Sequence, residues 1–337
     1  MQRELHGGRR RSSTSRDPSS NRGPQFGKPM TAEHQLEGDL FREAISLLRH
    51  STDESHIFLK MEQTFKHRQE LIQDSEKCET ILSVFPRFLD TKGLVVQDFQ
   101  MIGEEVSPKL MEKWGTSLKV KVIKEANNLT KTPVLESLIQ SAVESPEGND
   151  ESSLHLNDLF PTTTTIHFGM QKEEITIFLF QNIKTYLAEM SWDSDMAALL
   201  LLVYLLPPPP GGKKRPVKVT VREALSHVVC FHKSCRNLQE TTSSVQGRQP
   251  YILAVGTTRR TINDYYIVVD GQLIPCKAKS SISAFDELFK VHYVFGISYD
   301  QALHNMYTLV QTTIYNIDVG LCHESPRVKD LRAKLLN

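Results

Sequence analysis

The sequence lacks an excess of charge of either sign, and it lacks a long apolar run. Lys and Arg together number 40, Asp and Glu together number 40, and the formal net charge is zero. A neutral chain has no overall field that attracts nucleic acid or an anionic membrane, so such binding depends on a local patch. The longest apolar run, 196–206, ends at consecutive prolines and is about half of the roughly 20 residues that a membrane span needs. It predicts a buried core helix and no membrane contact.

Cysteine is scarce and widely spaced. The chain has 5 cysteines, an odd number, and no apolar leader segment precedes them. Small secreted domains that depend on disulfides carry dense, paired cysteines behind a signal peptide, and this pattern does not fit that class. We expect reduced thiols in an intracellular compartment, either the cytoplasm or the nucleus.

Recognised catalytic and ligand-binding motifs are also missing. The sequence contains no GxSxG nucleophile elbow, no GxxxxGK[ST] phosphate loop and no GxGxxG fingerprint. We therefore expect a protein that is not an enzyme, with no catalytic residue, no cofactor-binding residue and no cofactor. An enzymatic alternative stays open if Cys276, Asp286 and His304 converge in a concave pocket.

The segment HVVCFHKSC is the best candidate for a metal site. It holds His227, Cys230, His232 and Cys235, all of which are zinc-type ligands. The pattern of residues 219–238 predicts a helix, on which these four positions spread over roughly 200° of the circumference. One helix cannot surround a single ion with ligands spread in this way. No metal ligand is therefore predicted.

The first 33 residues are predicted to be a disordered basic tail. They are rich in Gly, Ser, Pro and Arg and nearly free of large apolar side chains, so they bury too little surface to offset the entropy of ordering. Within the tail, Arg9, Arg10 and Arg11 precede Ser12 and Ser13. The arginines are candidate polyanion contacts. The serines are candidate phosphorylation sites, whose modification would reverse part of the local charge.

The rest of the chain divides by composition into three segments. Residues 34–143 show helical periodicity and are predicted to form a helical region. Residues 144–170 contain no Lys or Arg and are predicted to be an acidic linker or loop. Residues 171–337 are predicted to form an α+β domain, interrupted at 207–217 by a connector rich in Pro, Gly and basic residues.

The clearest strands are 251–256 and 265–270, which are rich in β-branched and aromatic residues. Asp270 and Gly271 form a two-residue hairpin signal, and Pro275 in the return strand marks a sheet edge. The expected fold class is α+β and mostly helical. A helical N-terminal region precedes a C-terminal unit in which helices pack on a small antiparallel sheet of about three strands.

Several residues are predicted to cap helices because of their type and position. A serine or aspartate at the first non-helical position accepts a hydrogen bond from the backbone of the first turn. The predicted N-caps are Ser107, Asp193 or Asp195, Ser283, Ser298 with Gln301 three residues later, and Ser325; Gly115 is predicted to end the helix that Ser107 begins.

A set of motifs carries a family resemblance. The segments are WDSDMAALLLLVYLLPP, QPYILAVG, YYIVVDGQLIPC, AFDELFKVHYVFGISYDQAL, YTLVQTTIYNIDVG and ESPRVKDLRAKLLN. Together they resemble a multicopy family of uncharacterised fish proteins, some of whose members are labelled sterile-alpha-motif-domain-containing-protein-like. The resemblance covers about residues 80–337. It implies no activity, cofactor or catalytic residue.

Good capping and hairpin signals without a convergent polar motif favour a non-enzymatic protein-interaction or assembly module. Its partner is an unidentified protein or a second copy of the chain. The alternative is a nucleic-acid-associated protein that uses the basic N-terminal arm and lysine-rich helices. The lysines of those helices are Lys109, Lys113, Lys119, Lys121 and Lys124.

Overall fold

The computed structural model describes residues 34–74, 76–144, 191–209, 219–234, 238 and 250–337. Nearly all of the acidic segment 144–170 and most of the connector 207–217 lie outside the described residues. The predicted tail 1–33 lies outside them as well, with Arg9, Arg10, Arg11, Ser12 and Ser13. These expectations stay predictions.

The N-terminal part of the described chain is helical, as its periodicity predicted. Helix α1 is the first of these helices, and the apolar residues from Ile57 to Ile72 lie on the next two. The elements are α1 (Gly38–His50), α2 (Glu54–Gln63), α3 (Phe65–Gln73), η1 (Cys78–Thr80), α4 (Ile81–Val84), η2 (Pro86–Leu89), α5 (Leu94–Gly103) and η3 (Glu104–Val106).

The next helical stretch is longer than predicted. It comprises α6 (Lys109–Lys113), the π-helical turn η4 (Trp114–Leu118) and α7 (Lys119–Asn127), followed by α8 (Pro133–Val143). The prediction that Ser107 caps a helix is wrong, because its φ of −54° and ψ of −41° are already helical, whereas an N-cap has a non-helical backbone. The prediction that Gly115 ends this helix is also wrong, because the glycine lies within the wide turn that continues into α7.

The predicted core helix is α10 (Ser194–Leu205). Asp193 caps it, since the carboxylate accepts hydrogen bonds from the amides of Asp195 and Met196. Every residue from Met196 to Leu205 except Tyr204 is buried. A helix that is apolar on all sides is buried on all sides. No helix in the described part of the chain is long and apolar enough to span a bilayer.

The sheet has four strands in the order β1-β2-β3-β4. They are β1 (Val229–Lys233), β2 (Tyr251–Gly256), β3 (Ile262–Val269) and β4 (Gln272–Pro275). The predicted hairpin is confirmed, with φ of 48° at Asp270 and 76° at Gly271. These positive values are those of the two central residues of a type I′ turn. Pro275 lies on an edge strand, as predicted.

The prediction of an antiparallel sheet of three strands is wrong in one respect, because β1 is a fourth strand that pairs in parallel with β2. The predicted helix 219–238 ends early, since α11 (Val221–Val228) leads directly into β1. The β-branched and aromatic residues of VVCF favour a strand where a partner is present. That partner, β2, is distant in sequence. The sheet is therefore mixed.

Helices α13 (Ser281–Val294), α14 (His304–Leu309) and α15 (Pro326–Leu336) complete the fold, with the π-helical turn η6 (Val310–Tyr315) after α14. Ser325 caps α15, as predicted. The other two predicted caps are wrong. Ser280 caps α13 and Ser283 is the reciprocal partner in its capping box, while α14 begins only at His304 without a side-chain cap.

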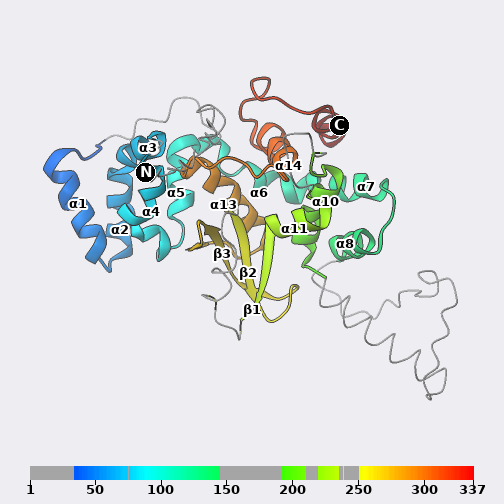
Figure 1. The fold of residues 1–337 in the computed structure, drawn as a ribbon, viewed down its shortest axis with the longest axis horizontal. Coiled ribbons are helices and arrows are strands. Elements are labelled where there is room, and N and C mark those ends of the chain that lie inside the picture. Colours follow the sequence, from blue (N-terminus) through cyan, green and yellow to red (C-terminus); the bar gives the residue numbers. More distant parts are fainter. Residues whose placement is uncertain (1–33, 75, 145–190, 210–218, 235–237, 239–249) are drawn as a thin grey trace, which may run out of the picture.

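One hydrophobic cluster joins the N-terminal helices to the C-terminal unit. It runs from Leu48 to Leu335, with α7 and α8 packed on α10, and α5 packed on α13. In Figure 1, α13 lies between the N-terminal helices and α10, beside the sheet. The predicted segment boundaries stay predictions. The two parts nevertheless share a core, so neither contains all the apolar contacts that stabilise it.

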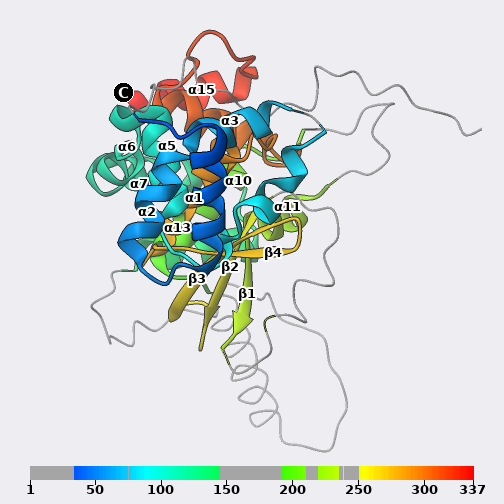
Figure 2. The same cartoon turned by 90° about the vertical axis from the view of Figure 1, so that its left-hand side faces the viewer.

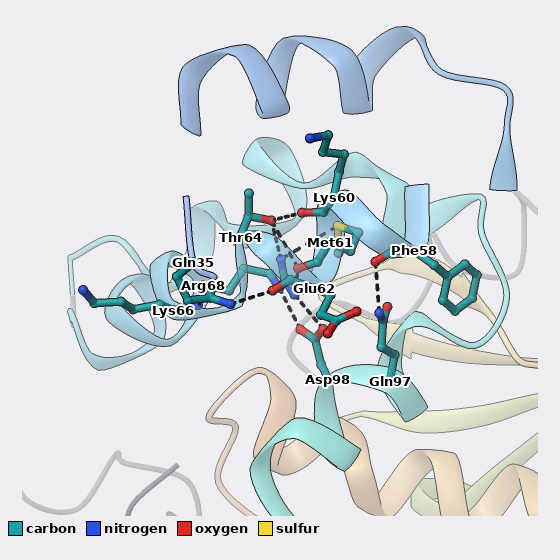
Figure 3. A network of polar contacts seen from close by, with 10 residues as sticks. All are labelled: Gln35, Phe58, Lys60, Met61, Glu62, Thr64, Lys66, Arg68, Gln97 and Asp98. Carbon is teal, nitrogen blue, oxygen red and sulfur yellow. Dashed lines mark hydrogen bonds and ion pairs between the residues drawn. The ribbon is translucent and has the colours of Figure 1, made fainter. Parts of the chain in front are cut away.

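A buried ion pair ties α3 to α5 (Figure 3). Arg68 and Asp98 are both 0% exposed, and the guanidinium donates two hydrogen bonds to the carboxylate, at 2.7 and 2.6 Å. It also donates to the Met61 carbonyl at 2.6 Å and to the Thr64 hydroxyl at 2.9 Å. Burial raises the pKa of Asp98, and the guanidinium opposes that shift. A buried charge is tolerated only when it is paired and hydrogen-bonded in this way.

We expect Asp98→Asn to destabilise the protein by about 3–5 kcal/mol, because it leaves the Arg68 charge buried without its counter-ion. The double variant Arg68→Met with Asp98→Leu should recover most of the loss, since no charge remains buried. The measurement is the free energy of unfolding from chemical denaturation. Arg42→Gln is the control: its ion pair with Asp39 is exposed, and the expected change is within about 0.5 kcal/mol. A small effect of Asp98→Asn would contradict this account.

Candidate functional site

Asp286 and Cys276, two of the residues that sequence analysis singled out for chemistry, are buried, Asp286 on α13 and Cys276 directly after β4. Asp286 accepts hydrogen bonds from Lys290 at 2.5 Å and from the Tyr315 hydroxyl. The Lys290 ammonium lies 5.5 Å from the centroid of the Phe99 ring. Burial raises the pKa of Asp286, and the nearby ammonium opposes the shift. Asp286, Lys290 and Tyr315 thus satisfy one another's polar groups within the core.

A second buried pair is formed by Cys276, directly after β4, and Glu287 on α13. Cys276 is 2% exposed and Glu287 is 3% exposed. Burial, with the nearby Glu287 carboxyl, raises the pKa of the Cys276 thiol well above its usual value. Burial also raises the pKa of Glu287 to about 7, although its carboxyl accepts a hydrogen bond from the Lys277 amide at 3.3 Å. Because the thiolate is the nucleophile, a buried thiol with a raised pKa is unreactive.

The enzymatic alternative required Cys276, Asp286 and His304 to converge. Cys276 interacts with Glu287, and Asp286 with Lys290 and Tyr315. The His304 ring lies 6.4 Å from the Tyr299 ring. These contacts are with different groups, and the alternative gains no support from them.

The segment considered for zinc is part helix and part strand. His227 lies on α11, where its Nδ1 is 2.8 Å from an Asp300 carboxylate oxygen, and Cys230 and His232 lie on β1. Cys235 is outside the described residues. The argument against a metal site assumed one helix over residues 219–238, but the helix ends at Val228. Among the residues that the structure describes, no group of three His, Cys, Asp or Glu side chains could hold a metal ion.

Most of the lysines considered for nucleic-acid binding contact the protein's own backbone. Lys113 donates to the carbonyls of Thr313 at 3.0 Å and Ile314 at 2.7 Å, near the end of η6. Lys121 donates to the Leu335 carbonyl at 2.8 Å, near the end of α15. The last carbonyls of a helix have no partner within the helix and carry partial negative charge. These ammonium groups therefore act as helix caps supplied by another helix.

Lys119 contacts polar side chains at the start of α10. Its ammonium donates to the Ser194 hydroxyl at 2.7 Å and to the Asp195 carboxylate at 2.8 Å, and the Trp114 indole donates to that carboxylate at 2.9 Å. Lys109 lies 3.4 Å from the Tyr315 carbonyl. Four of the five lysines are thus engaged in intramolecular contacts.

A shallow surface groove of about 260 Å³ lies along α1. Phe41 and Ile45 line it from α1, and Val84 lines it from α4. These three apolar side chains are partly buried against the main core cluster. Arg42 and Arg49 line the same groove. It is therefore an apolar surface that carries positive charge.

Both ends of α1 are anchored, which fixes the shape of the groove. At the start of the helix, the Leu36 amide donates to the Gln63 carbonyl at 2.9 Å. At its end, the Arg87 guanidinium donates to the Leu48 carbonyl and, at 2.7 Å, to the Ser51 carbonyl. These contacts hold α1 against α2 and η2.

The opposite flank of α1 also exposes apolar side chains. Leu40 is 60% exposed and Leu47 is 39% exposed. At 100° per residue these leucines lie within about 20° of each other, on the side of the helix away from Ile45. In Figure 2, α1 lies in front of the other helices. It thus exposes apolar surface on both sides of the stripe that it buries.

Comparison with known families identifies the segment that carries the groove. Residues 35–91 match the family model described as sterile alpha motif domain-containing protein 3, helical domain. No curated protein matches the chain, and no solved structure does. The match confirms a similarity to the sterile alpha motif domain-containing protein 3 family in this segment. The matched segment 35–91 contains every residue that lines the groove.

Sequence analysis missed the groove, although part of its signal was present. Phe41 and Ile45 are four residues apart and Arg42 and Arg49 are seven apart, so each pair lies on one side of a helix. Val84 has no such signal, because only the folded chain brings α4 beside α1.

We expect the buried carboxyl of Glu287 to make stability depend on pH. Its pKa rises on folding from 4.5 to about 7, so its contribution to stability is present at low pH and is lost between about pH 4.5 and 7. The loss is about 3 kcal/mol. Glu287→Gln does not titrate. The free energy of unfolding of this variant relative to the wild type should therefore rise by about 2–3 kcal/mol from pH 5 to pH 8.

Glu112→Gln, at an exposed position on α6, is the matched control, and its difference from the wild type should not change with pH. A difference for Glu287→Gln that is equally constant would show that Glu287 has an ordinary pKa in the folded protein.

Proposed function

We propose that this protein is a non-enzymatic protein-interaction or assembly module that binds its partner through the groove on α1. The observation that carries the proposal is the position of its charged side chains. Asp286, Glu287 and Lys290 are each at most 5% exposed and interact with the core, whereas Arg42 and Arg49 lie at an open apolar groove. Binding needs accessible groups, and the groove offers them.

The anchoring of α1 supports this proposal. A groove whose walls are fixed before binding loses little conformational entropy when it is filled, so more of the contact energy appears as affinity. The contacts from Arg87 and Gln63 provide that rigidity. Residues 35–91 match the helical domain of sterile alpha motif domain-containing protein 3, and we assign partner binding to this segment. We also propose that the chain belongs to the multicopy group of fish proteins and that it is located inside the cell.

The alternative, binding to nucleic acid, depends on Arg9, Arg10 and Arg11. Four of the five helical lysines contact the protein itself. The net charge is zero, so no overall field adds to the local attraction. The basic arm remains the feature that favours this alternative.

We expect Ile45→Glu to abolish capture of protein partners that the wild-type full chain retains, because it places a carboxylate on the apolar floor of the groove. Val120→Glu is the matched control, since it makes the same chemical change at a helical position that is 69% exposed on α7. Ser46→Trp tests the same groove by filling it and removes no buried apolar side chain. The measurement is cross-linked capture quantified by mass spectrometry, with thermal unfolding to verify the fold.

Partners lost from both groove variants and retained by Val120→Glu would be the expected result. The proposal fails if all three variants retain the same proteins as the wild type. Light scattering of the same samples tests a second copy of the chain as the partner.

We expect the full chain to bind random-sequence DNA or RNA only weakly at physiological salt. If the arm binds phosphates, the triple variant Arg9→Gln, Arg10→Gln, Arg11→Gln lowers the affinity. It also reduces the slope of the logarithm of the binding constant against the logarithm of the salt concentration by about 3. The measurement is fluorescence anisotropy across a salt series. Tight binding that the triple variant leaves unchanged would point to a basic surface other than the arm.

A further inference from the structure

The groove on α1 combines an apolar floor with a wall of one charge. Phe41, Ile45 and Val84 form the floor, and Arg42 and Arg49 stand at its side. No Asp or Glu lines the groove within the described part of the chain. Arg42 pairs with Asp39 at 2.8 Å, but the two side chains are 80% and 94% exposed, and ion pairs this exposed exchange readily for other partners. The groove therefore favours an occupant that is both apolar and acidic.

The spacing of the arginines restricts the shape of that occupant. Arg42 and Arg49 are seven residues apart, which places them on the same side of α1 and about 10 Å apart along its axis. Ile45 lies between them in the sequence and lines the floor. A second helix lying along α1 repeats this spacing when its carboxylates are seven residues apart and apolar side chains lie three and four residues after the first carboxylate.

We infer that the groove binds an acidic amphipathic helix of a partner protein, which inserts its apolar side into the floor and pairs two carboxylates with Arg42 and Arg49. This inference rests on the proposed interaction function and specifies the chemistry of the partner. Recognition of an amphipathic helix by an apolar groove is an established mode of binding. Complementary charge adds specificity and speeds association more than it adds affinity.

The test uses the full chain and a designed probe. The probe is a fluorescent, alanine-rich helical peptide of about 18 residues, long enough to form a helix, with two glutamates and two leucines at the spacing given above. Companion peptides replace both glutamates with glutamine, both glutamates with arginine, or both leucines with alanine. Binding is measured by fluorescence anisotropy at low and at physiological salt.

The decisive protein variant is Arg42→Glu with Arg49→Glu. It should bind the acidic peptide at least about tenfold more weakly than the wild type at low salt, with a smaller difference at high salt, because exposed charges are screened. It should also bind the arginine peptide more tightly than the wild type does. Lys124→Glu with Lys131→Glu is the matched control, because it makes the same change in net charge at exposed positions outside the groove lining. This control should bind as the wild type does.

Each other outcome has a distinct meaning. Equal binding of the acidic and glutamine peptides, lost in Ile45→Glu, would overturn the acidic partner and leave the groove as a protein-binding site. Binding of the acidic peptide that neither the arginine variant nor Ile45→Glu weakens would overturn the groove itself. Displacement of the acidic peptide by single-stranded DNA or by anionic vesicles as readily as by its unlabelled form would show a general anion site and overturn the inference. Concentration-dependent dimerisation that is lost in Ile45→Glu and unaffected by the acidic peptide would identify a second copy as the occupant, and would also overturn it.

Discussion

The ion pair between Arg68 and Asp98 fixes the position of the N-terminal helices relative to the rest of the molecule. It joins α3 to α5 at a fully buried point, and α5 packs on α13, the helix beside the sheet. The Arg68 guanidinium also lies over the ring of Phe85, at 5.0 Å from its centroid. A buried charge can be satisfied in very few geometries, so this pair restricts how the helices can pack more strictly than apolar contacts alone. The groove on α1 is built on the unit positioned in this way.

The buried charged groups of this protein interact with one another and with the backbone, and they are not accessible to a ligand. Asp286, Lys290 and Tyr315 satisfy one another, and Lys113 and Lys121 cap the ends of η6 and α15. Burial raises the pKa of Asp286 and of Tyr315, and it also keeps substrates away from them. Perturbed pKa values mark catalytic sites only where the groups are accessible. The surface of α1 therefore offers more for function than the interior.

The zero net charge of the chain does not reveal which charged side chains are used inside the fold and which lie at the surface of α1. Lys113 and Lys121 cap helix ends, and Lys290 balances the buried carboxylate of Asp286. Arg42 and Arg49 differ because they stand at an apolar surface that is already fixed in shape. A pair of positive charges beside exposed apolar area can select one kind of partner even on a protein that is neutral overall.

The sequence by itself determined the class of the fold and its local punctuation. Apolar periodicity indicated the helical region that begins with α1, and an unbroken apolar run located the core helix α10. Asp193, Ser325 and the Asp270–Gly271 turn follow from backbone chemistry that acts within a few residues. Tertiary structure alone decided that Val229–Lys233 is a strand, because its partner β2 lies beyond a long stretch of chain. It also decided that Arg68 meets Asp98 and that Val84 completes the groove. Contacts between residues far apart in sequence leave no periodic signal, so only the folded chain determines them.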